Sequence, residues 1–129
     1  MSKKILIADD EPSIVAAVEF LLQRRGYEVH VARDGDEALR LVEACNPDLV
    51  LLDVMMPQKS GYEVCTRIRA RPDLQHIKII MLSAKGRDAE VSKGLALGAD
   101  VYVTKPFSTR ELMAKIHGLL EPGVKPGSA

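Results

Sequence analysis

Five short apolar runs alternate with segments of helical periodicity, and this alternation constrains the fold of the chain more than any other feature. The runs are rich in branched side chains and cover residues 5–8, 27–32, 49–52, 77–82 and 101–103. Between the runs, apolar residues recur at helical spacing, as at Ile14, Val18 and Leu21, with charged residues on the other face. Strands that are apolar on both faces and alternate with helices form parallel sheets that are covered on each side. We therefore predict a doubly wound α/β domain with a five-stranded parallel sheet and five helices.

The ends of the expected helices carry signals of their own. Pro12 suits a first helical turn, and Gly26 and Gly98 suit the left-handed position that follows a helix. Three helices are expected to begin at a polar cap that stands three residues before a glutamate: Asp34 before Glu37, Ser60 before Glu63 and Ser108 before Glu111. These boundaries agree with the apolar pattern.

The composition is that of one globular domain. The chain has 129 residues, 47% of them apolar and 28% charged, so it can bury a core without disulfides or a structural metal. Basic and acidic residues number 18 each, which leaves no overall charge to attract nucleic acid or an anionic membrane. Cys45 and Cys65 stand far apart and the three histidines do not cluster, so a zinc site is not expected.

The two ends of the sequence bear on location and domain boundaries. Only a four-residue apolar run precedes Asp9, which is too short for a signal-peptide core, and no stretch is long enough to span a bilayer. We expect a cytoplasmic domain without direct contact to a membrane or to nucleic acid. Residues 122–129 contain two prolines and two glycines without apolar periodicity, which predicts a flexible tail or the start of a linker after a domain of residues 1–121.

Polar side chains follow four of the five apolar runs. Asp9 and Asp10 come after the first run, Asp53 after the third, Ser83 after the fourth and Lys105 shortly after the fifth. Because ligands bind at the carboxyl ends of parallel strands, we expect these residues to converge on one edge of the sheet. Three adjacent carboxylates repel one another unless a cation binds, and their oxygen ligands favour a hard cation such as Mg²⁺.

Asp53 is the best-placed nucleophile of this group, since we expect it at the centre of the sheet. An aspartate can form an aspartyl-phosphate, and phosphoryl transfer needs positioning and charge neutralisation more than covalent assistance. Lys105 and Ser83 would bind phosphoryl oxygens, and the small Ala84 leaves room for the phosphoryl donor. A plainer interpretation stays open, in which the aspartates only cap a helix or close a strand and the lysine is solvated.

Four motifs stand at these expected strand ends: ILIADDE at residues 5–11, LLDVMMP at residues 51–57 with Gly61 after it, LSA at residues 82–84, and GAD at residues 98–100 followed by KPF at residues 105–107. Together they resemble the receiver domains of two-component response regulators, over about residues 3–120. The resemblance implies a flavodoxin-like sheet with the strand order 2-1-3-4-5. It also implies a phosphorylation switch that is not a conventional enzyme, because a receiver catalyses only its own phosphorylation and dephosphorylation.

The resemblance assigns roles to individual residues. Asp53 would be the phosphoacceptor, and a sensor histidine kinase would be the phosphoryl donor. Asp10, Asp53 and the backbone carbonyl of Met55 would bind Mg²⁺ directly, whereas Asp9 would act through water. Ser83, Ala84 and Lys105 would surround the phosphoryl group.

By the same resemblance, Ser83 and Tyr102 would form the switch, with Tyr102 moving inward when Ser83 approaches the phosphate. The Lys105–Pro106 peptide bond is expected to be cis. Met55 and Lys85 occupy positions that tune phosphate lifetime in related domains. A homodimer or output partner would use the fourth helix, the fifth strand and the last helix, across residues 87–120.

Other functions are compatible with parts of the sequence. A small-molecule phosphatase of the haloacid-dehalogenase type would have a second aspartate where this chain has Met55. A degenerate receiver could serve only for docking, although every matching acidic, hydroxyl and lysine position is present. The chain could also be the receiver part of a longer transcriptional regulator with a DNA-binding domain. The cognate kinase, the stimulus, the phosphate lifetime and the oligomeric state are not encoded in any motif we identified.

Overall fold

The computed structural model describes residues 3–84 and 86–121 of the chain. Strands and helices alternate throughout this part of the chain. The strands are β1 (Lys4–Ala8), β2 (Glu28–Ala32), β3 (Leu49–Asp53), β4 (Lys78–Ser83) and β5 (Val101–Thr104). The helices are α1 (Pro12–Arg24), α2 (Gly35–Cys45), α3 (Gly61–Arg69), α4 (Asp88–Ala96) and α5 (Thr109–Leu120), with a short 3₁₀ helix η1 (Pro72–Leu74) after α3.

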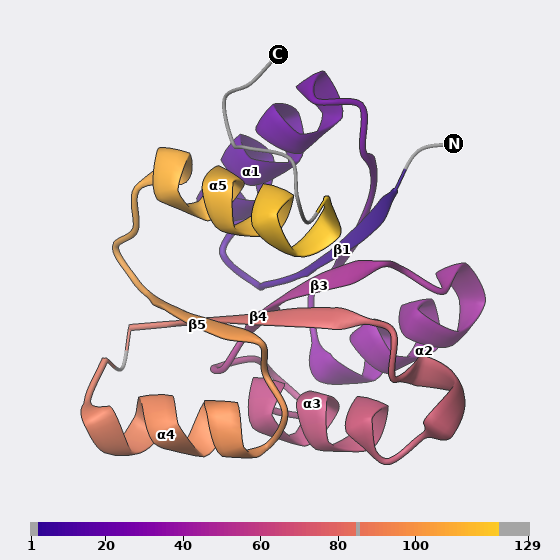
Figure 1. The fold of residues 1–129 in the computed structure, drawn as a ribbon, viewed down its shortest axis with the longest axis vertical. Helices are drawn as coiled ribbons and strands as arrows, with labels where there is room; N and C mark the ends of the chain where they lie inside the picture. Colours follow the sequence, from indigo (N-terminus) through magenta and orange to yellow (C-terminus); the bar gives the residue numbers. More distant parts are fainter. Residues whose placement is uncertain (1–2, 85, 122–129) are drawn as a thin grey trace.

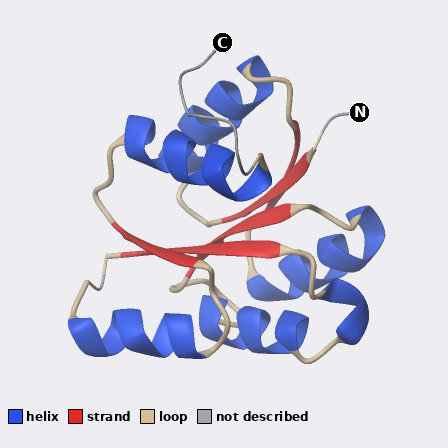
Figure 2. Ribbon diagram, viewed as in Figure 1, coloured by secondary structure: helices blue, strands red, loops and turns tan. Residues whose placement is uncertain are grey.

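The five strands form one parallel sheet in the order β2-β1-β3-β4-β5 (Figure 1). Helices α1 and α5 cover one face of the sheet, and α2, α3 and α4 cover the other (Figure 2). The predicted doubly wound fold and its strand order are therefore confirmed. No helix within residues 3–84 and 86–121 is long and apolar enough to cross a membrane.

Two expected strands begin one residue later than the apolar pattern indicated. The backbone N–H of Tyr27 donates to the carbonyl of Leu22 at 3.2 Å and closes the end of α1, so β2 begins at Glu28. The N–H of Ile77 donates to the carbonyl of Leu74 at 3.2 Å, so β4 begins at Lys78. Apolar character marks burial, and it does not separate a strand from the turn that enters it.

The alternation of side chains along each strand divides the core into two layers. Ile5 and Ile7 of β1 point to the face covered by α1 and α5, whereas Leu6 and Ala8 point to the face covered by α2 and α3. All five residues of β3 are buried, because this strand lies at the centre of the sheet and is covered on both faces. The core thus holds the carboxyl ends of β1, β3 and β4 in a fixed register.

The three predicted polar caps are confirmed. Asp34 accepts a hydrogen bond from the N–H of Glu37, and Ser60 and Ser108 do the same for the residues three positions on. At α2 the Glu37 carboxylate in turn accepts a hydrogen bond from the N–H of Arg33, the residue before the cap, at 2.9 Å. Gly26 and Gly98 have φ values of +89° and +112°, as their predicted positions after helices require.

Gly98 allows a test of this backbone geometry. We expect Gly98→Ala to lower the free energy of unfolding by about 1–2 kcal/mol or more, because its φ is unfavourable for a residue with a Cβ. In addition, the new Cβ would lie 2.6 Å from Cγ of Arg69. Gly118→Ala in α5, whose Cβ would meet nothing within 4 Å, should be neutral or stabilising by up to about 1 kcal/mol. Urea unfolding measures the free energy of unfolding of both variants. Equal values for Gly98→Ala and Gly118→Ala would contradict the left-handed conformation of Gly98.

Candidate functional site

The polar residues predicted to converge lie at the carboxyl ends of four strands. Asp53 is the last residue of β3 and Ser83 is the last residue of β4, while Asp9 directly follows β1. Lys105 directly follows β5, and its N–H donates to the carbonyl of Ser83 at 2.8 Å. The parallel register of the sheet therefore brings residues from distant parts of the sequence to one edge.

Three carboxylates form an acidic cluster at this edge. Asp9, Asp10 and Asp53 each offer an oxygen atom that lies within 4.8 Å of the other two. Asp9 and Asp53 are buried, whereas Asp10 is exposed. Short backbone contacts orient both buried side chains: Oδ1 of Asp9 accepts from the N–H of Glu11 at 2.9 Å, and Oδ1 of Asp53 accepts from the N–H of Met55 at 3.1 Å. An all-oxygen group of this kind, with one exposed member, is suited to a hard divalent cation.

Lys105 provides the positive charge of the site. Its Nζ lies 3.2 Å from Oδ2 of Asp9, 3.4 Å from Oδ2 of Asp53 and 2.8 Å from Oε1 of Glu11. Its side chain is only 10% exposed, so this ammonium group is not the solvated cation of the plainer interpretation. The peptide bond between Lys105 and Pro106 is cis.

Burial and charge shift the protonation equilibria of this group. Burial raises the pKa of Asp53 to about 6, the negative charge of Asp9 adds to the increase, and the Lys105 ammonium opposes it. Burial acts to lower the pKa of Lys105, but its hydrogen bond to Glu11 and the charges of Asp53 and Asp9 outweigh burial, so this pKa is raised. Lys105 therefore stays protonated, and the three carboxylates beside it carry more negative charge than this one ammonium group neutralises. A second cation could neutralise the remainder.

The plainer interpretation of the aspartates does not describe this geometry. Helix α1 begins at Pro12 with Glu11 as its N-cap residue, and no side chain caps it. Asp9 and Asp10 consequently do not act as its cap. Asp53 does close a strand, but it does so inside the protein and among charged neighbours.

The remaining predicted site residues surround the cluster. Ser83 is fully buried, Ala84 is exposed beside it, and the Met55 side chain is exposed, with 59% of the residue accessible. Lys85, which the sequence singled out as a tuning position, lies outside the described residues. The predicted tail, residues 122–129, also lies outside them.

Tyr102 lies half-buried on β5 and packs against the α3–α4 side of the sheet. Its ring lies over Gly94, where an added Cβ would approach ring carbons at 2.9 and 3.1 Å. The pKa of Tyr62 in α3 is raised to about 12 by burial and by a hydrogen bond with Tyr102. The Tyr62 hydroxyl also lies 3.3 Å from the backbone carbonyl of Glu90, to which it donates. Tyr102 is thus connected to both α3 and α4.

Glu11 had no predicted role, although it forms the shortest contact to Lys105. The only available signal was its place directly after the two aspartates. Lys105 lies 94 positions further along the sequence and reaches Glu11 only because β5 ends at the same edge of the sheet. A linear pattern cannot tell whether an acidic residue after a strand forms such a pair or faces solvent.

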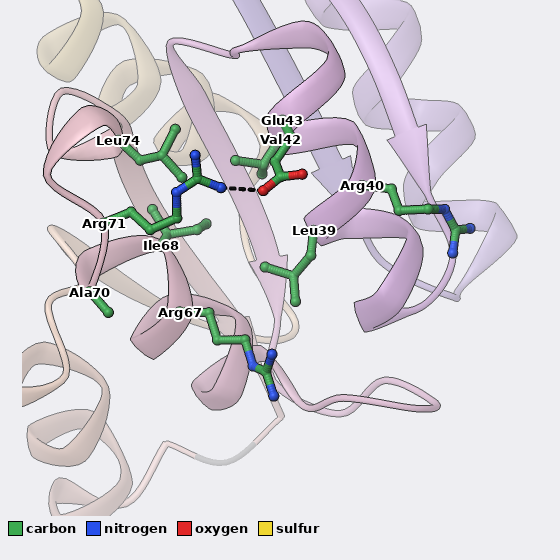
Figure 3. Close-up of a pocket in the computed structure, with 9 residues that line it drawn as sticks. All are labelled: Leu39, Arg40, Val42, Glu43, Arg67, Ile68, Ala70, Arg71 and Leu74. Atoms are coloured by element: carbon green, nitrogen blue, oxygen red, sulfur yellow. Dashed lines mark hydrogen bonds and ion pairs between the residues drawn. The ribbon is translucent and has the colours of Figure 1, made fainter.

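A groove of about 350 Å³ lies elsewhere, between α2 and the α3–η1 segment (Figure 3). Its floor is apolar, with Val42, Ile68 and Leu74, and arginines stand around it. Arg71 pairs with Glu43 across the groove and with Asp73, while Arg67 pairs with Glu63. Two of the arginines at the groove, Arg67 and Arg71, therefore have acidic partners within the chain.

A scan against protein-family models matches residues 5–117 to the response regulator receiver domain. The chain belongs to this family. Receiver domains are the signalling switches of two-component systems, and the recognition made from the four motifs is therefore confirmed.

Similar proteins agree with this assignment. The chain is 48% identical, over 120 residues, to the alkaline phosphatase synthesis transcriptional regulatory protein PhoP of Bacillus subtilis; the match covers 93% of this receiver domain and 49% of PhoP. The chain therefore spans about half the length of this curated relative. A response regulator from Chloroflexus aurantiacus is 34% identical with a TM-score of 0.87, covering 92% of this chain and 98% of that one. A BeF3-activated DrrB receiver domain is 37% identical with a TM-score of 0.84, covering 94% and 99%.

The raised pKa of Asp53 predicts how stability depends on pH. Because the folded-state pKa, about 6, exceeds the value near 4 expected for the unfolded chain, protonation favours the folded state. In metal-free protein, this contribution is complete below pH 4 and is lost as pH rises through 6. We expect the free energy of unfolding of the native protein, relative to Asp53→Asn, to fall by on the order of 2 kcal/mol between pH 4.5 and 7.5.

Urea unfolding in the presence of a chelator, at several pH values, measures this difference. Comparison with the variant cancels the contributions of carboxylates that do not interact with Asp53. A difference between the two proteins that does not change with pH would show that Asp53 titrates normally.

Proposed function

We propose that this receiver domain is a phosphoacceptor switch that is phosphorylated on Asp53 by a sensor histidine kinase in a Mg²⁺-dependent transfer. One observation carries the proposal: the buried Asp53 carboxylate lies 3.4 Å from the Lys105 ammonium and within 4.8 Å of two further carboxylates. A nucleophile, a fixed cation and a set of oxygen ligands for a metal are thus assembled at one edge of the sheet.

The residues fit a magnesium ion. Asp10 and Asp53 would bind it directly together with the backbone carbonyl of Met55, and Asp9 would act through water. The ion would neutralise charge on the phosphoryl oxygens and on the acidic cluster. Mg²⁺ usually keeps several waters, so few protein ligands suffice, and the exposure of Asp10 leaves the cluster accessible from solvent.

In the proposed transfer, a carboxylate oxygen of Asp53 forms a bond to the donor phosphorus while the bond between phosphorus and the donor histidine nitrogen breaks. The electron pair of that bond leaves with the imidazole, which takes up a proton. Lys105 and Ser83 would bind phosphoryl oxygens, and the small side chain of Ala84 leaves space beside Ser83. Attack of water on the phosphorus of the aspartyl-phosphate would break its bond to the Asp53 oxygen, release inorganic phosphate and return Asp53 to its free carboxylate, so the domain would act only on its own phosphorylation state.

Output would depend on Ser83 and Tyr102. These residues come from the neighbouring strands β4 and β5, and Tyr102 packs against Gly94 of α4, which belongs to the proposed output surface. That surface comprises α4, β5 and α5, where a second copy of the chain or an output partner would bind. Similar domains have been described as BeF3-activated, which supports a switch between two states in this fold.

A longer transcriptional regulator is the second candidate for the biological context. The similar PhoP is a transcriptional regulatory protein, and this chain covers only 49% of it. A DNA-binding domain after the receiver would then provide the output. The alternative is a receiver that serves only for docking, and such a domain would not accept a phosphoryl group.

Intact mass spectrometry after incubation with acetyl phosphate tests the proposal. With Mg²⁺ we expect the addition of one phosphoryl group, and without Mg²⁺ or in Asp53→Asn we expect none. Asp73→Asn removes an exposed carboxylate that pairs with Arg71 away from the site, and it should accept phosphate like the native protein. If neither acetyl phosphate nor an active histidine kinase modified the native protein, the docking module would be favoured.

Sedimentation tests the output surface. If Tyr102 couples the phosphoryl site to the α4–β5–α5 surface, phosphorylation should change the sedimentation coefficient of the native protein and not that of Tyr102→Ala. The variant should still accept one phosphoryl group by mass, since Tyr102 lies outside the acidic cluster. If phosphorylation changed the sedimentation coefficient of Tyr102→Ala as much as that of the native protein, Tyr102 would not be part of the switch.

A further inference from the structure

The loop between Asp53 and α3 contains a tight, strained turn. The N–H of Lys59 donates to the carbonyl of Pro57, two residues earlier, at 2.9 Å. Gln58, between them, has a φ of +71°, a conformation that residues with a Cβ rarely adopt. Such a turn persists only where its surroundings hold it, and such turns gather at functional sites.

The two ends of this loop are held together next to Asp53, the proposed phosphoacceptor. The N–H of Gly61 donates to the carbonyl of Val54 at 2.9 Å, and a Cβ on Gly61 would lie 2.4 Å from the carbonyl oxygen of Asp53. The loop therefore leaves the sheet at Asp53 and returns to it at Gly61. Met55, whose carbonyl is a proposed metal ligand, lies in the first part of this loop.

The far end of the loop is held by the start of α2. The N–H of Gly35, the first residue of that helix, donates to the carbonyl of Pro57 at 3.2 Å. The contact is so close that a Cβ on Gly35 would lie 2.2 Å from the carbonyl oxygen of Lys59. The Lys59 ammonium also pairs with the carboxylate of Asp36, the second residue of α2.

We propose that the first turn of α2, through Gly35 and Asp36, is a brace that holds the loop of residues 54–60 in place and thereby sets the affinity of the site for Mg²⁺. This inference rests on the proposed function, because it takes the Met55 carbonyl as a metal ligand. A loop that is already ordered loses less conformational freedom when its carbonyl binds a metal, so bracing strengthens binding without a direct contact to the ion. Gly35, Asp36 and Lys59 are positioning residues in this scheme.

Gly35→Ala tests the close contact. The added methyl group cannot be accommodated without moving the backbone at Lys59, so we expect the dissociation constant for Mg²⁺ to rise about tenfold, as is typical when a residue that supports a metal ligand is lost. Isothermal titration of the full chain with MgCl₂ measures it. Gly118→Ala, a helical glycine with open space around it, should bind Mg²⁺ like the native protein.

Two charge variants keep the test decisive if Gly35→Ala fails to fold. Asp36→Asn and Lys59→Gln each break the ion pair without adding an atom to the buried contact. The brace predicts that each weakens Mg²⁺ binding by about two- to fivefold, the range for a partly exposed ion pair. A purely electrostatic effect predicts opposite signs, since loss of an acid weakens and loss of a base strengthens the binding of a cation. The double variant should bind Mg²⁺ no more weakly than either single variant, because each single substitution already removes the same ion pair.

The outcomes separate this inference from the proposed function. If the native protein binds no Mg²⁺, the proposed function and the brace both fail. If the native protein binds Mg²⁺ and the folded variants bind it equally well, or if the two charge variants shift affinity in opposite directions, the brace alone is refuted. Thermal unfolding without Mg²⁺ provides the comparison with global stability: weaker binding in Asp36→Asn and Lys59→Gln, with an unfolding midpoint close to that of the native protein, supports a positioning role.

Discussion

The site depends on keeping two carboxylates, Asp9 and Asp53, close together inside the protein. Burial alone would favour their neutral forms, and their mutual repulsion increases that cost. Lys105 lies within 3.4 Å of both and offsets part of it, while backbone N–H groups orient each carboxylate. The raised pKa of Asp53 shows that the compensation is incomplete. A further cation bound beside these carboxylates would offset the remaining repulsion.

The sheet provides the rigidity that this arrangement requires. In β3 every residue is buried, and its neighbours β1 and β4 are packed on both faces, so the strand ends cannot move apart without opening the core. The charged groups lie just beyond these ends, where side chains no longer need to be apolar. Repulsion among the aspartates is therefore borne by packing elsewhere in the domain, which is a common way for proteins to hold unfavourable groups at a functional site.

The loop after Asp53 and the edge strand β5 border the site. Asp53 is followed by a loop with a strained turn, and Ser83 is adjacent in the sheet to Thr104 of the edge strand β5. Tyr102 on that strand contacts α3 and α4 through Tyr62 and Gly94. The acidic site thus lies between the packed centre of the sheet and two borders, the loop that contacts α2 and the edge strand β5 with α4.

The sequence by itself determined the elements and their order. The apolar runs gave the strands to within one residue, the caps at Asp34, Ser60 and Ser108 marked three helix starts, and four motifs identified the family. These are local properties, because periodicity and capping depend on residues a few positions apart. Polar residues follow four of the strands, and they were predicted to converge because the carboxyl ends of parallel strands lie at one edge of a sheet.

Only the tertiary structure decided which groups meet. It distinguished buried Asp9 from exposed Asp10, paired Glu11 with Lys105, and placed the first turn of α2 against the loop after Asp53. It also placed Tyr27 and Ile77, which look like strand residues in the linear pattern, in the turns that follow α1 and η1. The Glu11–Lys105 pair and the contact between α2 and the loop depend on how segments far apart in the chain approach each other, and that approach is set by packing of the whole domain rather than by any local pattern.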